Sequence, residues 1–270
     1  MEVEVIEPHG FCSGVSRALR LAEDALAAAS PSNPVYCLRA IVHNELVTGS
    51  LARRGMRFVE SLSEVPEGAT VLFSAHGVSP AVRAEAEGRG LVVVDATCPF
   101  VERAHRQLRD YAARGIPAVV VGDPGHAEVL GYMGESAVAD VGSISPGSRI
   151  GVVVQTTYDS AAADAAIAAL REKFDVETSP AAETCNATRD RQAAVRAFDG
   201  DAVLVLGSVS SANTRRLAEI AEASGKRAFR AGTADEVAAL DFSGVSRFGI
   251  TSGASTPESL LLEAVDICSR

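Results

Sequence analysis

The fold is decided by residues 91–106, LVVVDATCPFVERAHR. The four apolar residues 91–94 predict a parallel strand that is buried on both faces. After a short turn, a helix is expected to begin at or just after Cys98, with Thr97 as its N-cap and Pro99 in its first turn. Cys98 then lies at the carboxyl end of a strand and the amino end of a helix, where open α/β sheets bind ligands and a thiolate is favoured.

Strand and helix patterns alternate along the whole chain. Strands are expected at residues 3–6, 35–38, 71–73, 91–94, 118–121, 150–154, 202–206 and 248–250. Helices are expected at about 16–28, 43–54, 160–174, 189–198 and 210–224, and from 79, 98 and 257 onward, with 176–183 as a polar connection. This order is typical of an α/β protein with mostly parallel sheets and helices on both faces.

Three cysteines recur at nearly equal spacing. Cys12, Cys98 and Cys185 are 86 and 87 residues apart, and each comes just before an expected helix. The spacing predicts three similar α/β units of under a hundred residues. We expect their boundaries at 14–97, at 98–184, and at 185–270 together with 1–13. If the units surround an axis, each contributes one thiolate to a common centre.

Composition excludes several classes of partner. The chain has 25 basic and 35 acidic residues, a net charge of −10, and its basic residues are scattered, which argues against nucleic-acid binding. An anionic substrate would need local His, Ser, Asn and backbone donors. No apolar run approaches the length of a membrane span, and the amino terminus leads directly into a strand beside acidic residues. We therefore expect a cytoplasmic protein with no membrane partner.

The five cysteines fall into two kinds. Cys37 and Cys268 lie inside apolar segments and are interpreted as ordinary buried residues. Cys12, Cys98 and Cys185 lie in turns rich in Gly, Thr or Ser, which favours metal or catalytic roles. Zinc sites usually contain local Cys or His pairs, and three thiolates from distant loops suit an iron–sulfur cluster better. A four-iron cluster on three cysteines keeps one iron open to substrate.

Three of the five histidines share one structural position. His43, His76 and His126 each lie at a strand end or a helix start, where imidazoles can hydrogen-bond phosphate oxygens. His9, in the first turn, and His105, in the middle of a helix, are interpreted as structural.

Further polar residues lie at helix starts. Ser211, Asn213 and Ser255 offer donors where backbone N–H groups point outward, so they are either anion ligands or plain caps. Glu128 follows His126 by two residues. A carboxylate beside an anion pocket is costly unless it handles protons, and the alternative is a solvated charge at a helix end.

Together, these segments resemble the motifs of the 4-hydroxy-3-methylbut-2-enyl diphosphate reductase (LytB/IspH) family, in the same order and over nearly the whole chain. They are GFCSGV (10–15), VHN (42–44), FSAHGV (73–78), DATCP (95–99), GHAEV (125–129), QTT (155–157), CNAT (185–188) with RQ (191–192), and GITSGASTP (249–257). This family performs the last step of the methylerythritol phosphate route to isoprenoids.

The resemblance implies a pseudo-threefold trefoil of three α/β units around a [4Fe–4S] cluster held by Cys12, Cys98 and Cys185, with one open iron. It implies substrate-binding residues at His43, His76, His126, Thr156, Ser211, Asn213 and Ser255. Glu128, Thr156 and His126 would be catalytic, with Glu128 and Thr156 in the proton path. The substrate would be an allylic diphosphate that loses its hydroxyl in a two-electron, two-proton reduction to isopentenyl and dimethylallyl diphosphates. A ferredoxin or flavodoxin would supply the electrons.

The chain also departs from the family pattern. The run 209–213 reads VSSAN where the family usually has KNSSN, so Ala212 lacks a serine hydroxyl, a loss of roughly 1.5–3 kcal/mol in binding a charged oxygen. His9, Ala127, Leu130 and Asp190 are further departures. Three alternatives stay open: a divergent paralogue acting on a related allylic diphosphate, a non-catalytic redox sensor that binds a cluster, and a zinc-dependent lyase with a three-cysteine site.

Overall fold

A computed structural model of the chain describes residues 2–179 and 184–270. The described strands form three sheets, and every strand pairing in them is parallel. The chain divides into two compact units. Unit 1 takes in the chain up to Val15 together with His43–Gly49 and Asn186–Arg270, and unit 2 takes in Ser16–Val42 and Ser50–Cys185.

Unit 1 contains one four-stranded sheet in the order β1-β11-β9-β10. Its strands are β1 (Glu2–Val5), β9 (Ala202–Leu206), β10 (Arg227–Ala231) and β11 (Arg247–Ser252). Its helices are α7 (Asn186–Ala197), α8 (Ala212–Ala223), α9 (Ala234–Ala238) and α10 (Glu258–Ser269). Two more helices, α1 (Ser13–Ala27) and α2 (Glu45–Arg53), carry the chain from unit 1 into unit 2.

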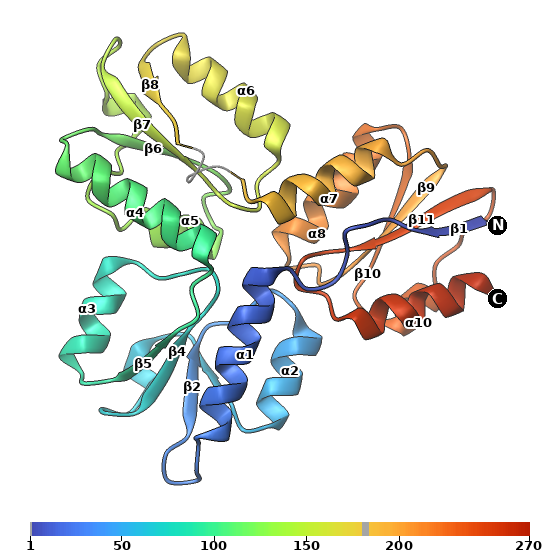
Figure 1. The fold of residues 1–270 in the computed structure, drawn as a ribbon, viewed down its shortest axis with the longest axis horizontal. Helices are drawn as coiled ribbons and strands as arrows, with labels where there is room; N and C mark the ends of the chain where they lie inside the picture. The colour runs from blue at the N-terminus through green and yellow to red at the C-terminus, as the bar shows by residue number, and fades with distance from the viewer. Residues whose placement is uncertain (1, 180–183) are drawn as a thin grey trace. The chain divides into compact units, whose positions relative to one another are not determined.

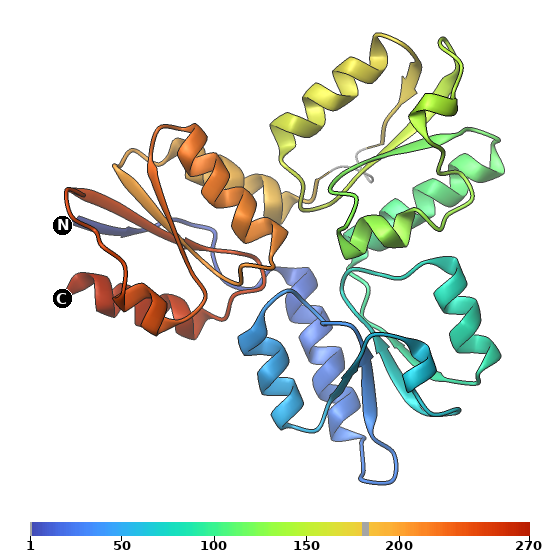
Figure 2. The ribbon, with the colours of Figure 1, turned by 180° about the vertical axis from the view of Figure 1, so that it is seen from behind.

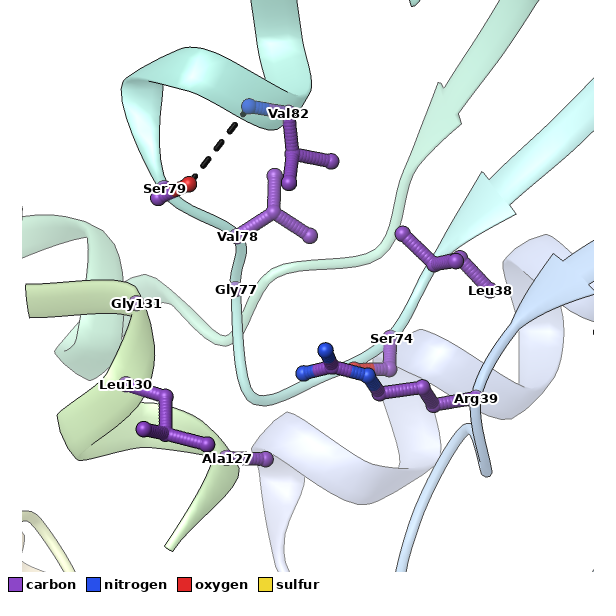
Figure 3. Close-up of a pocket in the computed structure, with 10 residues that line it drawn as sticks. All are labelled: Leu38, Arg39, Ser74, Gly77, Val78, Ser79, Val82, Ala127, Leu130 and Gly131. Atoms are coloured by element: carbon purple, nitrogen blue, oxygen red, sulfur yellow. Dashed lines mark hydrogen bonds between the residues drawn. The ribbon is translucent and has the colours of Figure 1, made fainter. Parts of the chain in front are cut away.

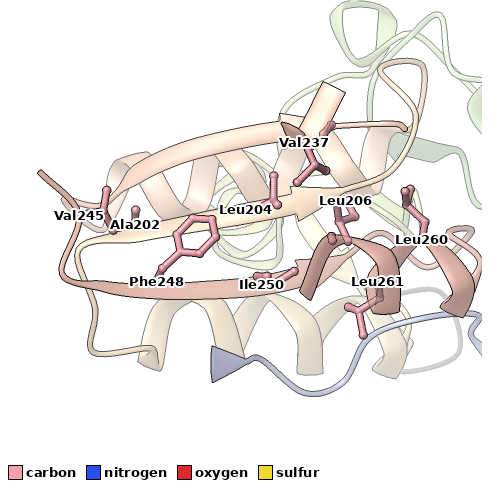
Figure 4. Close-up of a cluster of buried hydrophobic side chains, with 11 residues drawn as sticks. Ala202, Leu204, Leu206, Val237, Val245, Phe248, Ile250, Leu260 and Leu261 are labelled. Carbon is pink, nitrogen blue, oxygen red and sulfur yellow. The ribbon is translucent and has the colours of Figure 1, made fainter. Parts of the chain in front are cut away.

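The central strand β9 is apolar on both faces because helices cover both. Leu204 and Leu206 pack with side chains of α9 and α10 in one buried cluster, drawn in Figure 4. Val203 and Val205 pack with α7 and α8 in another. Alternate residues of a strand point to opposite faces, so a run of five apolar residues suits this position.

Unit 2 contains two sheets. The first has the order β3-β2-β4-β5 and the second β6-β7-β8. Their strands are β2 (Val35–Leu38), β3 (Arg57–Val59), β4 (Thr70–Phe73), β5 (Val92–Asp95), β6 (Ala118–Val121), β7 (Arg149–Val154) and β8 (Asp175–Glu177). The helices are η1 (Leu62–Glu64), α3 (Pro80–Gly88), α4 (Pro99–Ala113), α5 (Ala127–Tyr132), η2 (Val141–Ser143) and α6 (Ser160–Arg171).

Helices cover both faces of each sheet in unit 2. In the first sheet, α3 lies on the face opposite α1 and α2 (Figures 1 and 2). In the second sheet, α4 and the end of α5 pack on one face and α6 on the other. The α/β class, with parallel sheets in three similar units, is therefore confirmed. Each sheet draws its strands from one of the three predicted ranges, whose boundaries stay a prediction.

The stretch 91–106 forms a strand, a turn and a helix as predicted, but burial of the strand on both faces is wrong. β5 is an edge strand that pairs only with β4, and its Val92 and Val93 are 56% and 39% exposed. A run of valines has the same appearance at an edge as in the centre of a sheet, because strand propensity does not depend on the number of neighbours.

The predicted N-cap of α4 is also wrong by one residue. Asp95 accepts hydrogen bonds from both the N–H and the hydroxyl of Thr97, which stabilise the turn before the helix. Cys98 occupies the N-cap position without making a side-chain cap bond, and Pro99 begins the helix as expected. The thiol is therefore not used in capping.

Several elements escape the sequence patterns. β3, β8, β10 and α9 were not expected, since each is short or carries charged residues. β8 lies at the start of the predicted polar connection 176–183, and residues 180–183 lie outside the described part of the chain. Within the described ranges, no helix has the length and hydrophobicity needed to cross a membrane.

Candidate functional site

Cys12 lies in unit 1, in the turn between β1 and α1. Its N–H donates to the carbonyl of Ala254 (3.1 Å), and its Sγ accepts the Val15 N–H at 3.5 Å. The turn is held by Arg191, which is 3% exposed and donates to the carbonyls of Gly10 (2.8 Å) and His9 (3.2 Å). The Cys12 sulfur thus faces the first turn of α1, where the backbone N–H groups favour negative charge.

The structure brings four predicted anion ligands into unit 1: His43, Ser211, Asn213 and Ser255. The Ser255 hydroxyl donates to the carbonyl of His43 (3.1 Å), and Ser211 is the N-cap of α8. Burial lowers the pKa of His43, and the negative charge of Glu45 acts in the opposite direction. At neutral pH His43 is therefore mainly the neutral imidazole, with one ring N–H to donate.

Among these four residues, Asn213 gives the strongest indication of a bound polar ligand. It is 4% exposed, and neither its amide nitrogen nor its amide oxygen has a hydrogen-bond partner among residues 2–179 and 184–270. Burying an amide without partners costs free energy, so such groups usually have a reason to be there. A bound polar ligand would supply the missing partner.

The altered run 209–213 has its own arrangement. The hydroxyls of Ser208 and Ser210 both donate to Oε1 of Glu45, at 2.8 and 3.2 Å. These bonds contribute to a lowered pKa of Glu45, against the opposing effect of burial. Ser208, just before this run, and Ser210 within it thus bind a carboxylate of the chain itself.

Cys98 and Cys185 both lie in unit 2, near the same buried phenol. The Cys98 N–H donates to the carbonyl of Ala75 (2.9 Å), and the Cys185 N–H donates to that of Thr156 (3.1 Å). Burial, followed by the negative charges of Glu128, Cys98 and Cys185, raises the pKa of Tyr132 well above its usual range. In the described part of the chain, no three His, Cys, Asp or Glu side chains converge on a single metal ion.

Glu128 is not a solvated charge at a helix end. It is 1% exposed, and three donors reach its carboxyl group. Oε1 accepts from the Thr156 N–H (2.6 Å) and the Tyr132 hydroxyl (2.8 Å), and Oε2 accepts from the Thr156 hydroxyl (2.8 Å). Burial raises the pKa of Glu128, and these hydrogen bonds oppose that effect only in part. The group therefore keeps its proton to a higher pH than an ordinary glutamate, as a proton donor requires.

The two remaining histidines lie next to each other in unit 2. The rings of His76 and His126 pack edge to face with centroids 5.7 Å apart. Nδ1 of His126 accepts the Glu128 N–H (3.2 Å), so its neutral ring carries a proton on Nε2. The His76 loop depends on Gly77, where φ is +74° and a Cβ would lie 3.1–3.2 Å from neighbouring side chains.

A cavity of about 90 Å³ adjoins the His76 loop, at the carboxyl ends of β2 and β4 (Figure 3). From β2 the chain passes to β3 on one side of β2, and it then returns to form β4 on the other side. The strand order therefore reverses between β2 and β4, and open sheets commonly bind ligands at such a point. Its walls include Leu38, Val78 and Leu130, and the polar residues Arg39 and Ser74 also line it.

Cys37 and His105 are buried as expected, whereas Cys268 is only partly buried. Cys37 is fully buried, and burial raises the pKa of its thiol to about 12. Cys268 lies in α10 and its pKa is raised by partial burial. His105 is buried against Glu135, with Nδ1 and Oε1 2.8 Å apart. The structural roles of Arg191, Tyr132 and Glu135 were missed, because each depends on a tertiary contact that leaves no local sequence signal.

The sequence also matches known proteins over its full length. The family model described as LytB protein matches residues 3–269. The chain belongs to the LytB family. Two relatives of this LytB chain are the 4-hydroxy-3-methylbut-2-enyl diphosphate reductases of Acinetobacter baylyi and Chromohalobacter salexigens. They are 40% and 41% identical, in each case over 98% of this chain and 89% of the relative.

Solved LytB-type structures agree with this assignment. The E-1-hydroxy-2-methyl-but-2-enyl-4-diphosphate reductase from Plasmodium falciparum is 31% identical, with a TM-score of 0.93, over 100% of this chain and 88% of the other. A second structure, titled as (E)-4-hydroxy-3-methyl-but-2-enyl diphosphate reductase, the terminal enzyme of the non-mevalonate pathway, is 30% identical with a TM-score of 0.69. It is matched over 100% of this chain and 99% of its own.

Proposed function

We propose that this LytB chain is a 4-hydroxy-3-methylbut-2-enyl diphosphate reductase. In the reaction, the allylic C–O bond breaks, two electrons enter the carbon skeleton, one proton joins the leaving hydroxyl to make water, and a second proton joins carbon. The products are isopentenyl and dimethylallyl diphosphates. The observation that carries this proposal is the buried Glu128 carboxyl, bonded to Thr156, in a chain whose relatives are named for this reduction.

The chemistry of the donor set fits an iron–sulfur cluster. Enzymes of this family are iron–sulfur dependent, and Cys12, Cys98 and Cys185 would hold a [4Fe–4S] cluster, leaving one iron open. All three lie directly before helices, are partly exposed and form no disulfide. Each would bind a different iron, so the three sulfurs need not converge on one ion. When bound, the cluster supplies the electrons and a Lewis-acidic iron for the hydroxyl.

The diphosphate would be bound by neutral and polar donors. His43, Ser211, Asn213 and Ser255 supply them from unit 1, and His76 and His126 from unit 2. The net charge of −10 offers no general attraction for an anion, so short-range hydrogen bonds must provide the affinity. The unpaired amide of Asn213 and the Nε2–H of His126 support this assignment.

The proton would pass from Glu128 through Thr156. When Oε2 of Glu128 is protonated, its O–H can donate to Oγ1 of Thr156, 2.8 Å away. The Thr156 hydroxyl then turns its own hydrogen outward to the substrate. Two donors on Oε1 keep that oxygen an acceptor, which directs the proton to Oε2.

A cytoplasmic ferredoxin or flavodoxin is the proposed electron donor. The deciding experiment is an anaerobic assay of the reconstituted protein with a reduced donor and the hydroxylated allylic diphosphate. We expect consumption of substrate with formation of both five-carbon diphosphates. A brown, cluster-loaded protein that leaves this substrate unchanged would favour a redox sensor, and turnover of a related allylic diphosphate alone would indicate a divergent paralogue.

Asn213→Leu should weaken substrate binding without weakening the fold. The side chains have the same branching and the same number of heavy atoms, and the variant removes a buried amide that has no partner among the described residues. One lost hydrogen bond to a charged oxygen is worth about 1.5–3 kcal/mol, or roughly ten- to a hundredfold in KM. Urea unfolding should give an unchanged or higher free energy.

The matched control is Thr214→Val, in the same helix. Its Oγ1 is also buried without a partner among residues 2–179 and 184–270, but Thr214 is not a proposed ligand. We expect its KM to stay within twofold of the parent value. Equal KM values for the parent and Asn213→Leu would remove Asn213 from the diphosphate site.

A further inference from the structure

A buried phenol touches the carboxyl group on which the proposed proton transfer depends. Tyr132 has no exposed surface, and its hydroxyl donates to Oε1 of Glu128 at 2.8 Å. The two residues are four apart in α5, so they lie on the same face of one helical turn. This phenol had no role in the sequence motifs or in the proton path.

We propose that Tyr132 is a positioning residue that fixes the orientation and ionisation of the Glu128 carboxyl group, and that His105 holds Tyr132 in place. The proposal deepens the proposed function and rests on it, since it concerns the same carboxyl group. The Tyr132 hydroxyl donates a hydrogen bond to Oε1 of Glu128, while Thr156 donates to both carboxyl oxygens through its N–H and its hydroxyl. Within the described part of the chain, the hydroxyl of Thr156 is then the group in position to receive the Oε2 proton.

The phenol is itself held firmly. The His105 ring packs edge to face on Tyr132, with ring centroids 4.9 Å apart. His105 is fixed by its hydrogen bond to the buried Glu135, which also accepts from Arg109 at 3.3 Å. The chain of contacts from Glu135 to Thr156 therefore joins α4, α5 and the end of β7 into one rigid group.

The ionisation state of the phenol supports its role as a permanent donor. Its pKa is raised by burial and by the charges of Glu128, Cys98 and Cys185, so it keeps its proton throughout the physiological range. Among the described residues, the groups facing Glu128 are Thr156, just after β7, Tyr132 from its own helix, and the ring of His126, which accepts the Glu128 N–H. His105 packs on the Tyr132 ring, and the negative charges of Cys98 and Cys185 act on the Tyr132 hydroxyl.

The test compares Tyr132→Phe with Tyr111→Phe in the reconstituted enzyme. Both tyrosines are fully buried in one hydrophobic cluster, and each donates one hydrogen bond. Tyr111 donates to the carbonyl of Glu177 (3.2 Å) and does not touch Glu128. The variants should therefore lose similar stability, which makes them a matched pair.

We expect kcat of Tyr132→Phe to fall about ten- to a hundredfold with KM within twofold, and Tyr111→Phe to keep both. The second measurement is a pH titration by infrared spectroscopy, which follows the C=O band of the protonated Glu128 carboxyl group. This band is identified by its absence in Glu128→Gln. Removing the phenol donor destabilises the carboxylate, so the band should persist to higher pH in Tyr132→Phe only.

The outcomes separate the inference from the proposed function. If the parent turns over the diphosphate and Tyr132→Phe matches Tyr111→Phe in kcat and in titration, the positioning role is overturned. If no variant turns over this substrate but the Glu128 band still shifts in Tyr132→Phe alone, the positioning role stands and the proposed reaction fails.

Discussion

Cys98→Ser is expected to abolish both iron–sulfur loading and turnover. Iron–sulfur clusters are held by cysteine thiolates, and a serine hydroxyl at the same position is a poor ligand for iron. Cys98 makes no cap bond in α4, so its replacement leaves the helix start unchanged. Iron analysis and the visible spectrum of the anaerobically reconstituted protein measure the loss directly, and the same result is expected for Cys12→Ser and Cys185→Ser.

Cys268→Ser is the matched control, because it changes the same atom in a cysteine that lies within α10 and away from the turns. This variant should keep its iron, its colour and its activity. Full iron content in Cys98→Ser would exclude Cys98 as a ligand. A parent protein that binds zinc and remains colourless after reconstitution would favour the lyase alternative instead.

Glu128→Gln is expected to keep the cluster and lose most turnover. The amide oxygen can accept from Tyr132 and the Thr156 N–H, and the new NH2 group can donate to the Thr156 hydroxyl, so every bond of the buried carboxyl has a replacement. The glutamine cannot release a proton, and loss of a positioned proton donor typically costs about 10²–10⁴-fold in rate. Single-turnover assays at equal iron content should show this loss in kcat.

Glu177→Gln provides the comparison for loss of a carboxylate in the same unit. Glu177 pairs with Arg114 and Arg149 at the surface, and the hydrogen bond from Arg114 is the main cause that lowers its pKa, to about 2. We expect its turnover to equal that of the parent. If Glu128→Gln also kept the parental rate, Glu128 would not belong to the proton path.

Strand and helix patterns predict much of this fold because residues that face the core leave a local signal. Val203 and Leu204 face helices on opposite sides of the sheet, and a continuous apolar run predicts a strand that is buried on both faces. The pattern fails where burial depends on distant partners. Val92 and Val93 have the same local sequence signal as a central strand, but only β4 pairs with their strand.

Motifs predict candidate site residues better than they predict the contacts between them. His76 and His126 were each singled out by their position at a strand end or helix start, and the fold packs their rings together. The contacts that Tyr132 and His105 make around Glu128 could not be predicted from the sequence. Tyr132 and His105 look like ordinary apolar-face residues in the sequence, and only tertiary packing shows that one touches the carboxyl group and the other its partner.

The pairing of β1 with β11 has a consequence for biosynthesis. Glu2–Val5 pair with Arg247–Ile250, so β1 must wait unpaired while the whole intervening chain is translated. The Cys12 turn, held by Ala254 and Arg191, is completed with it. Loading of an inorganic cofactor that needs Cys12 therefore follows translation of β11, after all strands of the other two sheets have been made.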